Sequence, residues 1–221
     1  MRKVLLTKKL KENTAKLFEG IPDIELVTIP DGAQEQFDAH IKDAEALLLS
    51  TAYKMTREVI ERAANLKVIS RTGVGVDNVD VKAATEKGIL VLNTPEANSI
   101  SVAEHTLALI VAISKQLVMY DSELRVGNFA IRRTNMSVDI DGKTLGLIGC
   151  GRIGRFTAEK CKAAFNMNVI GYDPYIKELP GITLYENIED VFAKADYVSL
   201  HLPLTDETSN LVGESLLSKM K

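Results

Sequence analysis

The sequence predicts an α/β protein with two doubly wound parallel-sheet domains. Three observations predict this fold class. Short apolar runs alternate with segments of helical spacing along nearly all of the 221 residues, a glycine-rich turn follows one of these runs, and a long apolar helix divides the series in two. We place the boundary at this helix, so the predicted domains cover residues 1–98 and 99–221.

The first domain contains five predicted strands, each a short apolar or β-branched run of the kind that a parallel sheet buries. They are Val4–Leu6, Ile24–Val27, Ala46–Leu49, Val68–Ser70 and Ile89–Leu92. The apolar residues between Leu10 and Phe18 fit one stripe of a helix after the first strand. Thr56 is suited to cap the N-terminus of a helix over 57–64, and Gly88 is suited to end a helix over 80–87.

The second domain begins with a long helix that starts near Ser99 and runs to Tyr120 or beyond. We expect Glu104 in this helix to be a buried carboxylate that is paired inside the domain. A polar stretch over 125–141 follows, and then a new series of strands and helices begins. The predicted elements are strands over 144–148, 168–172 and 197–200, and a helix over 155–165.

Composition and charge exclude several classes of function. The 27 Lys and Arg residues are scattered among 30 Asp and Glu residues, so no basic patch for a nucleic acid or a membrane surface is predicted. Cys150 and Cys161 lack metal-ligand spacing and are too few for a disulfide framework, so we expect two small, buried, reduced thiols and no metal site. The N-terminus has no signal-peptide pattern, and the apolar run over 107–113 is far shorter than the roughly 20 residues of a membrane span. These features predict a cytoplasmic protein.

A glycine-rich turn links the buried run over 144–148 to a helical segment. Gly149, Gly151 and Gly154 form the pattern G-x-G-x-x-G. In this pattern the first glycine allows the tight turn, the second lets the backbone approach a pyrophosphate, and the third lets the helix pack closely against the strand. The amides at the start of the helix then face the anion. The turn therefore predicts a dinucleotide-binding site.

Asp173 ends the next predicted strand, 19 residues after Gly154. Dinucleotide-binding domains place at this distance the carboxylate that holds the adenosine ribose. A negative charge there repels the 2′-phosphate of NADP by about 1 to 4 kcal/mol, so NAD is favoured over NADP. The alternative interpretation is that Asp173 and Pro174 form a turn that only ends the strand.

His201 follows the predicted strand over 197–200, at the edge of the sheet where ligands of open α/β folds bind. The loop that begins at His201 is therefore expected to border the cofactor. From its position alone, His201 is interpreted as a residue that fixes this loop or contacts the cofactor, rather than as a general acid.

Taken together, four blocks of the sequence resemble the D-isomer-specific 2-hydroxyacid dehydrogenases, the family of D-3-phosphoglycerate, D-lactate, glycerate and formate dehydrogenases. The blocks occur in the order of the family and span almost the whole chain. They are Ser70–Asp80, Asn93–His105, the turn Gly149–Gly154 with Asp173, and His201–Thr205. The resemblance implies a flavodoxin-like substrate-binding domain over residues 1–98 and an NAD-binding Rossmann domain over residues 99–221.

The resemblance also implies which residues contact the ligands. The acid's carboxylate is received by backbone amides of Gly73, Val74 and Gly75, with Asn98 as a hinge or substrate-side residue. Val74 lies near the nicotinamide, and the residues of the glycine-rich turn contact the pyrophosphate, largely through their backbone. The implied NAD contacts are Val74, Gly149, Gly151, Arg152, Ile153, Gly154, Asp173, His201, Leu202, Pro203 and Thr208.

The sequence departs from the family pattern at its carboxyl end. The catalytic groups of the family are an Arg that binds the 2-oxo acid, a His that exchanges the proton, and a Glu or Asp that orients the His. All three lie beyond the block His201–Thr205, and no residue of 1–221 matches their motifs. We therefore expect no catalytic residue in this chain, a Rossmann domain without its later strands, and an exposed edge at the strand over 197–200. These expectations indicate a truncated piece of a longer protein.

The leading hypothesis is that the parent protein is an NAD-dependent D-2-hydroxyacid dehydrogenase, which passes a hydride between nicotinamide and C2 of a 2-hydroxy or 2-oxo acid. The Gly73 loop and the His201 block favour the phosphoglycerate or hydroxypyruvate type over the D-lactate type. Ser50, however, stands where many phosphoglycerate dehydrogenases have an arginine for the phosphate, and Lys54 could supply that charge instead. Because the family usually dimerises through its nucleotide domain, a homodimer is implied.

Two alternatives stay open at this point. The chain could be a non-catalytic NAD-binding fragment, or a binding module like the co-repressor branch of the same family. It could also belong to another class of Rossmann enzyme, such as an amino-acid or homocysteine-processing dehydrogenase, but the blocks at Gly73 and Asn93 are then unexplained.

Overall fold

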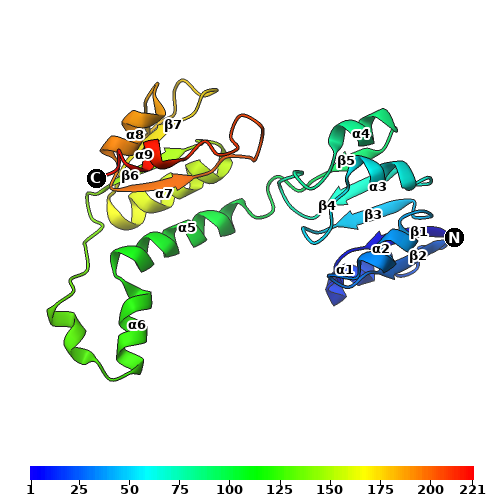
Figure 1. The fold of residues 1–221 in the computed structure, drawn as a ribbon, viewed down its shortest axis with the longest axis horizontal. Helices are drawn as coiled ribbons and strands as arrows, with labels where there is room; N and C mark the ends of the chain where they lie inside the picture. The colour runs from blue at the N-terminus through cyan, green and yellow to red at the C-terminus, as the bar shows by residue number, and fades with distance from the viewer. The chain divides into compact units, whose positions relative to one another are not determined.

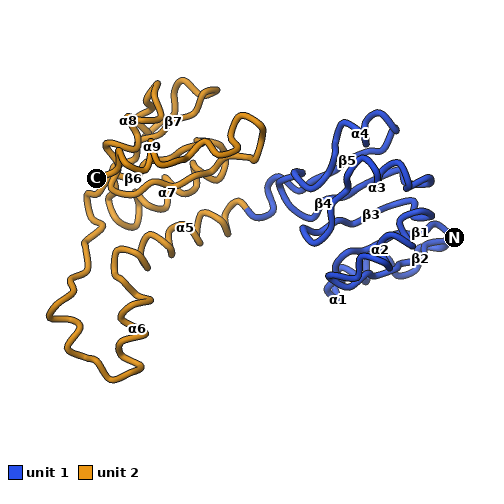
Figure 2. The backbone as a smooth tube through the Cα atoms, in the orientation of Figure 1, with its two compact units in different colours: residues 1–98 blue, residues 99–221 orange.

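The computed structural model describes residues 1–221, which divide into two compact units, residues 1–98 and residues 99–221 (Figure 2). Each unit has its own parallel sheet and its own hydrophobic core. The predicted class, α/β with two parallel sheets, is confirmed.

Unit 1 is built on a five-stranded sheet in the order β2-β1-β3-β4-β5, in which every neighbouring pair is parallel (Figure 1). This is the flavodoxin-like order, whose switch point lies between β1 and β3, and ligands of such sheets bind at the carboxyl ends of the strands. The strand bounds agree with the predicted ones within two residues. They are β1 (Arg2–Leu6), β2 (Ile24–Thr28), β3 (Ala46–Leu49), β4 (Val68–Arg71) and β5 (Leu90–Leu92).

The helices of unit 1 confirm the predicted caps, but the helix predicted between Leu10 and Phe18 does not form as a single element. The Thr56 side chain caps α3 by accepting from the Val59 amide (3.5 Å), and Gly88 follows the end of α4 with a φ of 73°. Asp80, predicted as the first residue of that helix, is instead its N-cap and accepts from the Ala83 amide (2.8 Å). The stripe after β1 instead splits into one α-helical and one 3₁₀ turn that bury no residue, and Leu17 is 72% exposed. The elements are α1 (Glu12–Ala15), η1 (Lys16–Phe18), α2 (Gln34–His40), α3 (Arg57–Arg62) and α4 (Val81–Glu86).

Unit 2 has a four-stranded parallel sheet in the order β8-β7-β6-β9. The glycine-rich turn follows β6, next to the point where the strand order reverses. As predicted, β9 is an edge strand, and its Leu200 is 51% exposed. The elements are β6 (Thr144–Ile148), α7 (Arg152–Phe165), β7 (Asn168–Tyr172), β8 (Thr183–Leu184), α8 (Ile188–Lys194), β9 (Tyr197–Leu200) and α9 (Glu214–Leu217).

The prediction of one continuous helix from Ser99 to Tyr120 is wrong. The helix breaks at Gln116 into α5 (Ser99–Ser114) and α6 (Leu117–Arg125), which are bent by 59° (Figure 1). Gln116 has a φ of 52°, a left-handed conformation that cannot continue a helix. Its side chain bonds the Met136 carbonyl oxygen (2.8 Å) and the Asn135 amide (2.7 Å), so the returning chain holds the bend.

The segment after α6 includes the 3₁₀ helix η2 (Phe129–Arg133) and is less polar on its surface than predicted, because Phe129 and Met136 are 60% and 82% exposed. No single helix of the chain is both long enough and apolar enough to cross a membrane. Only α5 and α6 counted together, across their bend, have the length and composition of a span.

Candidate functional site

The carboxyl ends of β1 and β3 in unit 1 are joined by side-chain hydrogen bonds at the switch point. Thr7, which is fully buried, accepts from the Ser50 amide at 2.7 Å, and the two hydroxyl oxygens are 3.1 Å apart. The Ser50 hydroxyl also lies within hydrogen-bond distance of the Thr7 carbonyl oxygen and the Ala52 amide, both at 3.3 Å. Ser50 therefore holds the loop after β3 against the end of β1.

Arg71 ends β4 at the same edge of the sheet and is the residue that the sequence analysis missed. Only 7% of it is exposed, and it forms no ion pair. Its Nε donates to Asn78 Oδ1 at 3.2 Å, while Nη1 and Nη2 have no acceptor in the chain. Because no buried polar side-chain atom lacks a hydrogen-bond partner, these two nitrogens keep contact with solvent. A buried cation without a carboxylate partner is costly, so this arrangement suits a bound anion.

The Gly73 loop lies directly against the Arg71 guanidinium. A Cβ atom at Gly73 would lie 2.6 Å from Arg71 Nη1 and 3.3 Å from Nη2, so glycine makes room for the cation. The Gly73 amide itself donates to the Arg71 carbonyl oxygen at 2.9 Å. The Gly73 amide is therefore not free to bind an anion, in contrast to the role that the family resemblance implied for it. The amides of Val74 and Gly75 have no partner in the chain.

The far side of this loop is tied to the end of β5. Asn93 Nδ2 donates to the Val74 carbonyl oxygen at 2.8 Å, and the Thr94 amide donates to the Gly73 carbonyl oxygen at 3.0 Å. The loop is thus held on both sides, by Arg71 and by the chain after β5. Asn98 is exposed at the boundary of unit 1, and its role in binding stays a prediction.

In unit 2, the three glycines of the turn between β6 and α7 differ in why glycine is needed. Gly149 has a φ of 92°, and a Cβ atom there would lie 2.5 Å from the His201 carbonyl oxygen. A Cβ atom at Gly154 would collide with the Gly149 carbonyl oxygen. At Gly151 no atom of the chain lies within 4 Å of the added Cβ. The packing of the chain therefore requires the first and third glycines but leaves the space beside the second one empty.

The start of α7 presents a positive helix end to this empty space. Gly151 is the N-cap residue, and its side-chain hydrogen cannot cap the helix, so no side chain covers the first turn at this position. α7 has 14 residues, and no acidic residue lies in its first turn. Such a helix end stabilises a bound phosphate through its amides and dipole. Arg152 and Ile153 occupy its first two positions.

Asp173 follows β7 and reaches back to the glycine-rich turn. Its Oδ2 accepts from the Cys150 amide at 2.9 Å, and its Oδ1 accepts from the Tyr175 amide at 3.0 Å. The second bond is the local turn that the alternative interpretation describes. The first bond places the carboxylate beside the turn, with lone pairs on both oxygens left for a diol.

His201 lies behind the same turn and is half-buried. Its Nε2 is 3.0 Å from the Ser199 hydroxyl, and burial lowers the pKa of its imidazole below the ordinary value. The ring is therefore neutral at pH 7, which suits a cofactor contact better than an anion-binding cation. The loop that follows borders a hollow of about 290 Å³, which Leu202, Pro203 and Thr208 help to line. The Thr208 hydroxyl accepts from the Thr205 amide at 2.8 Å and so keeps the loop closed.

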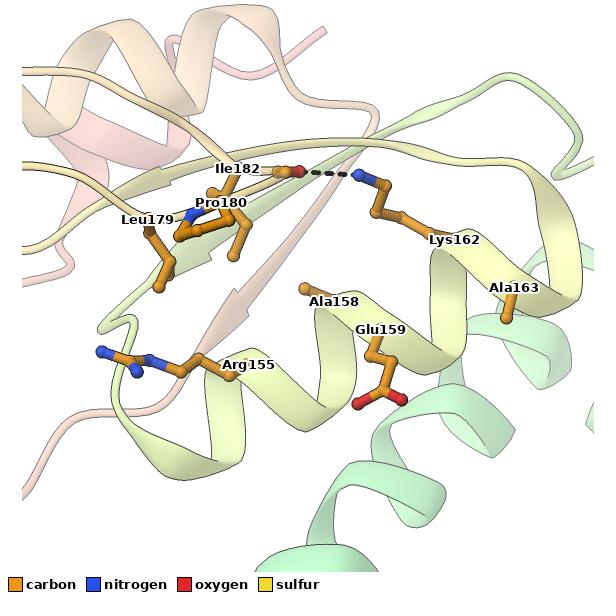
Figure 3. Close-up of a pocket in the computed structure, with 9 residues that line it drawn as sticks. Arg155, Ala158, Glu159, Lys162, Ala163, Leu179, Pro180 and Ile182 are labelled. Carbon is orange, nitrogen blue, oxygen red and sulfur yellow. Dashed lines mark hydrogen bonds between the residues drawn. The ribbon is translucent and has the colours of Figure 1, made fainter.

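A second hollow of about 580 Å³ lies on the flank of α7, and it contains none of the predicted ligand contacts (Figure 3). Arg155, Glu159 and Lys162 line it from the helix, and the chain over 179–182 closes its other side. Lys162 Nζ donates to the Gly181 carbonyl oxygen at 2.8 Å across it. Arg155 Nε donates to the Cys150 carbonyl oxygen at 3.2 Å, so both cations that line the hollow are engaged within the chain.

Two smaller expectations have different outcomes. Cys150 and Cys161 are fully buried as predicted, and burial raises the pKa of each thiol to about 11, so neither is a nucleophile at neutral pH. Glu104 is paired within its unit, with Lys160 of α7 at 3.3 Å, but it is exposed and not buried. No group of three or more His, Cys, Asp or Glu side chains is arranged to hold a metal ion.

Comparisons with known proteins agree with this architecture. D-3-phosphoglycerate dehydrogenase of Methanocaldococcus jannaschii is 43% identical over 225 residues, which cover 100% of this chain and 42% of that protein. D-lactate dehydrogenase of Aquifex aeolicus, solved with NAD and lactic acid, is 30% identical with a TM-score of 0.87, over 99% of this chain and 66% of the other. An acyclic imino acid reductase, solved with NADPH and D-Arg, is 29% identical with a TM-score of 0.88, over 99% of this chain and 71% of that protein.

The family model for the D-isomer specific 2-hydroxyacid dehydrogenase catalytic domain matches residues 4–219, nearly the whole chain. The chain spans less than half the length of the phosphoglycerate dehydrogenase that it matches. With both sheets, the glycine-rich turn and this match in agreement, the chain belongs to the D-isomer specific 2-hydroxyacid dehydrogenase family.

Proposed function

We propose that this chain forms the NAD-binding and acid-binding parts of a cytoplasmic NAD-dependent D-2-hydroxyacid dehydrogenase. The observation that carries the proposal is the open space beside Gly151, which faces the start of α7 and has the Asp173 carboxylate fixed next to it by the Cys150 amide. The chain's own packing does not need a glycine at this position. A pyrophosphate that approaches the backbone does.

The residues of unit 2 fit NAD in chemical type. The amides of the first turn of α7 would bind the pyrophosphate, Asp173 would bind the ribose hydroxyls, and neutral His201 would lie behind the turn. The carboxylate of Asp173 repels a 2′-phosphate, so we infer NAD and not NADP, although one structural relative was solved with NADPH. When bound, the nicotinamide supplies or takes up the hydride.

The residues of unit 1 fit the other reactant, a 2-hydroxy or 2-oxo acid. The Arg71 guanidinium and the free amides of Val74 and Gly75 together supply donors for a carboxylate. We favour a phosphoglycerate or hydroxypyruvate type of substrate, in line with the phosphoglycerate dehydrogenases among the relatives. Ser50 is occupied by Thr7, whereas Lys54 is exposed and forms no ion pair, so Lys54 is the candidate for a phosphate contact.

We assign no general acid or base among residues 1–221, so turnover in this proposal depends on groups of the parent protein outside them. We also propose a homodimer formed through the segment from α6 to residue 138. This segment exposes several apolar side chains, which a partner copy would cover. They are Val118, Val126, Phe129 and Met136.

The test is calorimetric titration of the chain with NAD and with NADP. NAD is expected to bind one to one and NADP at least tenfold more weakly. The variant Asp173→Asn keeps the size of the side chain but removes its charge, so it should bind NAD more weakly and lose the preference against NADP. Asp141→Asn, which changes an exposed carboxylate in the turn before β6, is the matched control. Absence of NAD binding by the folded chain would contradict the proposal.

A further inference from the structure

Asn78 is a buried amide that links the loop after β3 to the end of β4. It is 8% exposed, and each of its polar atoms has a protein partner. Nδ2 donates to the carbonyl oxygens of Ser50 (2.9 Å) and Tyr53 (2.8 Å), while Oδ1 accepts from Arg71 Nε (3.2 Å). Asn78 thus connects three pieces of chain at the edge of the sheet where the acid is proposed to bind.

The orientation of this amide is settled by its partners. Two carbonyl oxygens can face only the NH₂ group, because an oxygen in its place would repel both of them. The oxygen of Asn78 must therefore face Arg71. A substitution that keeps the size of the side chain but not this pattern would lose the contact with Nε.

The carbonyl oxygens that hold Asn78 belong to a fixed segment. Tyr53 is 2% exposed, stacks on Phe37 with ring centroids 4.6 Å apart, donates its hydroxyl to the Pro30 carbonyl oxygen, and accepts from the Ala33 amide at 3.1 Å. The backbone of Asn78 is also held, because its carbonyl oxygen accepts from the Met55 amide at 2.8 Å. Both the side chain and the backbone of Asn78 are thus held in place, and so is the oxygen that accepts from Arg71.

Arg71 depends on this support for its direction. The guanidinium is planar, so a fixed acceptor on Nε restricts the plane of the group and leaves Nη1 and Nη2 for another partner. Those two nitrogens lie at Gly73, where an added Cβ would be 2.6 Å and 3.3 Å from them, next to the unpaired amides of Val74 and Gly75. No other side chain contacts the guanidinium by a hydrogen bond.

We propose that Asn78 is a positioning residue, which holds the Arg71 guanidinium over the Gly73 loop so that an acid's carboxylate meets a pre-oriented pair of N–H donors. Asn78 does not touch the acid in this proposal, and the proposal rests on the function of Arg71 proposed above. Pre-orientation raises affinity, because the flexible side chain loses little freedom when the ligand binds. The loss of Asn78 should weaken the binding of the acid only as long as Arg71 is present.

A double-mutant cycle on the full chain tests this dependence. The four proteins are wild type, Asn78→Leu, Arg71→Met and the double variant, each titrated with 3-phosphoglycerate, hydroxypyruvate and NAD. Asn78→Leu should weaken acid binding about tenfold, leave NAD binding within twofold, and have no further effect on acid binding in the Arg71→Met background. An equal loss in both backgrounds, or no loss by folded Asn78→Leu, would overturn the proposal.

A second measurement separates this proposal from the proposed function. In ¹⁵N NMR spectra, the Arg71 Nε–H should exchange slowly with water in wild type and rapidly in Asn78→Leu. If no acid binds but this protection still depends on Asn78, the substrate assignment fails and the positioning role stands. If the protection is unchanged, the positioning role is wrong. Should Asn78→Leu not fold, Asn78→Ser, whose short hydroxyl leaves room for water at the loop carbonyls, should show the same loss of protection.

Discussion

The two proposed ligand sites of this chain are built in opposite ways. In unit 2, most groups come from one short segment, the turn over 149–154, and only Asp173 and the His201 loop join it from elsewhere. In unit 1, Arg71 depends on Asn78, and Asn78 in turn depends on the loop that contains Ser50 and Tyr53. The site in unit 2 is therefore encoded by a local sequence motif, whereas the site in unit 1 forms only after distant loops have packed together.

The glycines show the same difference. Gly149 is required by its positive φ and by the His201 backbone, and Gly73 by a side chain that the ligand is proposed to use. Gly151 is required by nothing inside the chain. Within the turn over 149–154, the two glycines that the packing requires serve the fold, while the glycine that it does not require fits the proposed pyrophosphate. Substitutions should separate these roles.

The largest effect is expected at Gly149. Alanine there has an unfavourable φ and lies against the His201 carbonyl, so we expect Gly149→Ala to reduce the free energy of unfolding by about 3 kcal/mol or more. Urea denaturation followed by circular dichroism measures this. Gly213→Ala, where the added Cβ meets no atom within 4 Å, is the control. A Gly149 variant as stable as its control would show that the backbone of the turn is not fixed as described.

The next effect is on acid binding through Arg71. Arg71→Met keeps the buried stem and removes the charge, so acid affinity should fall about 100-fold. The free energy of unfolding should fall by about 1 to 3 kcal/mol, because the buried Asn78 Oδ1 loses its donor. Competition titration with 3-phosphoglycerate measures the affinity. The control is Arg62→Met, which removes an exposed arginine paired with Asp38 and should leave the affinity for the acid unchanged. Equal losses in both variants would indicate a general effect of charge instead of a site at Arg71.

A smaller effect is expected at Gly151. Alanine fits the space inside the chain, so Gly151→Ala should fold with nearly wild-type stability, but its methyl group would obstruct a pyrophosphate and lower NAD affinity about tenfold. Stability and affinity are measured on the same preparation. If NAD affinity is retained, the open space at Gly151 is not the pyrophosphate site.

The smallest effect concerns pH. Burial lowers the pKa of His201 in the folded chain, so the unfolded chain takes up the proton first as the pH falls. This contribution to stability is present above the unfolded pKa of about 6.5 and is lost as the pH falls through the folded value. His201→Gln should therefore flatten the decline in the denaturation midpoint between pH 7 and 5. His105→Gln, at an exposed histidine, should not; equal slopes in all three proteins would exclude this role for His201.

The sequence predicted the fold well because the signals are local. Apolar runs predicted eight of the nine strands within two residues, and only the two-residue strand β8 was not predicted. Thr56 and Gly88 mark helix ends, Thr56 through its side-chain cap and Gly88 through its positive φ. The break at Gln116 was missed because no glycine or proline marks it. The break depends on hydrogen bonds to residues 19 and 20 positions further along the chain.

The candidate site could be predicted only in part, for the same reason. The glycine-rich turn and Asp173 are recognised by spacing, and the family resemblance pointed to the Gly73 loop. Arg71 stands inside one of the quoted blocks, but only its burial without an ion pair distinguishes it from a surface arginine. The one available signal was a charged residue at the end of an otherwise apolar strand. Asn78 has no such signal, because its partners lie 25 and 28 residues away.

The most direct test of this account is an amide and side-chain ¹⁵N NMR titration of the chain with each ligand separately. NAD should shift the signals of Gly149–Gly154, Asp173 and His201, and 3-phosphoglycerate should shift those of Arg71 and Gly75. Two separate sets of shifts are the predicted result. If NAD leaves the glycine-rich turn unchanged, or if the acid leaves the Gly73 loop unchanged, the assignment of that unit is contradicted.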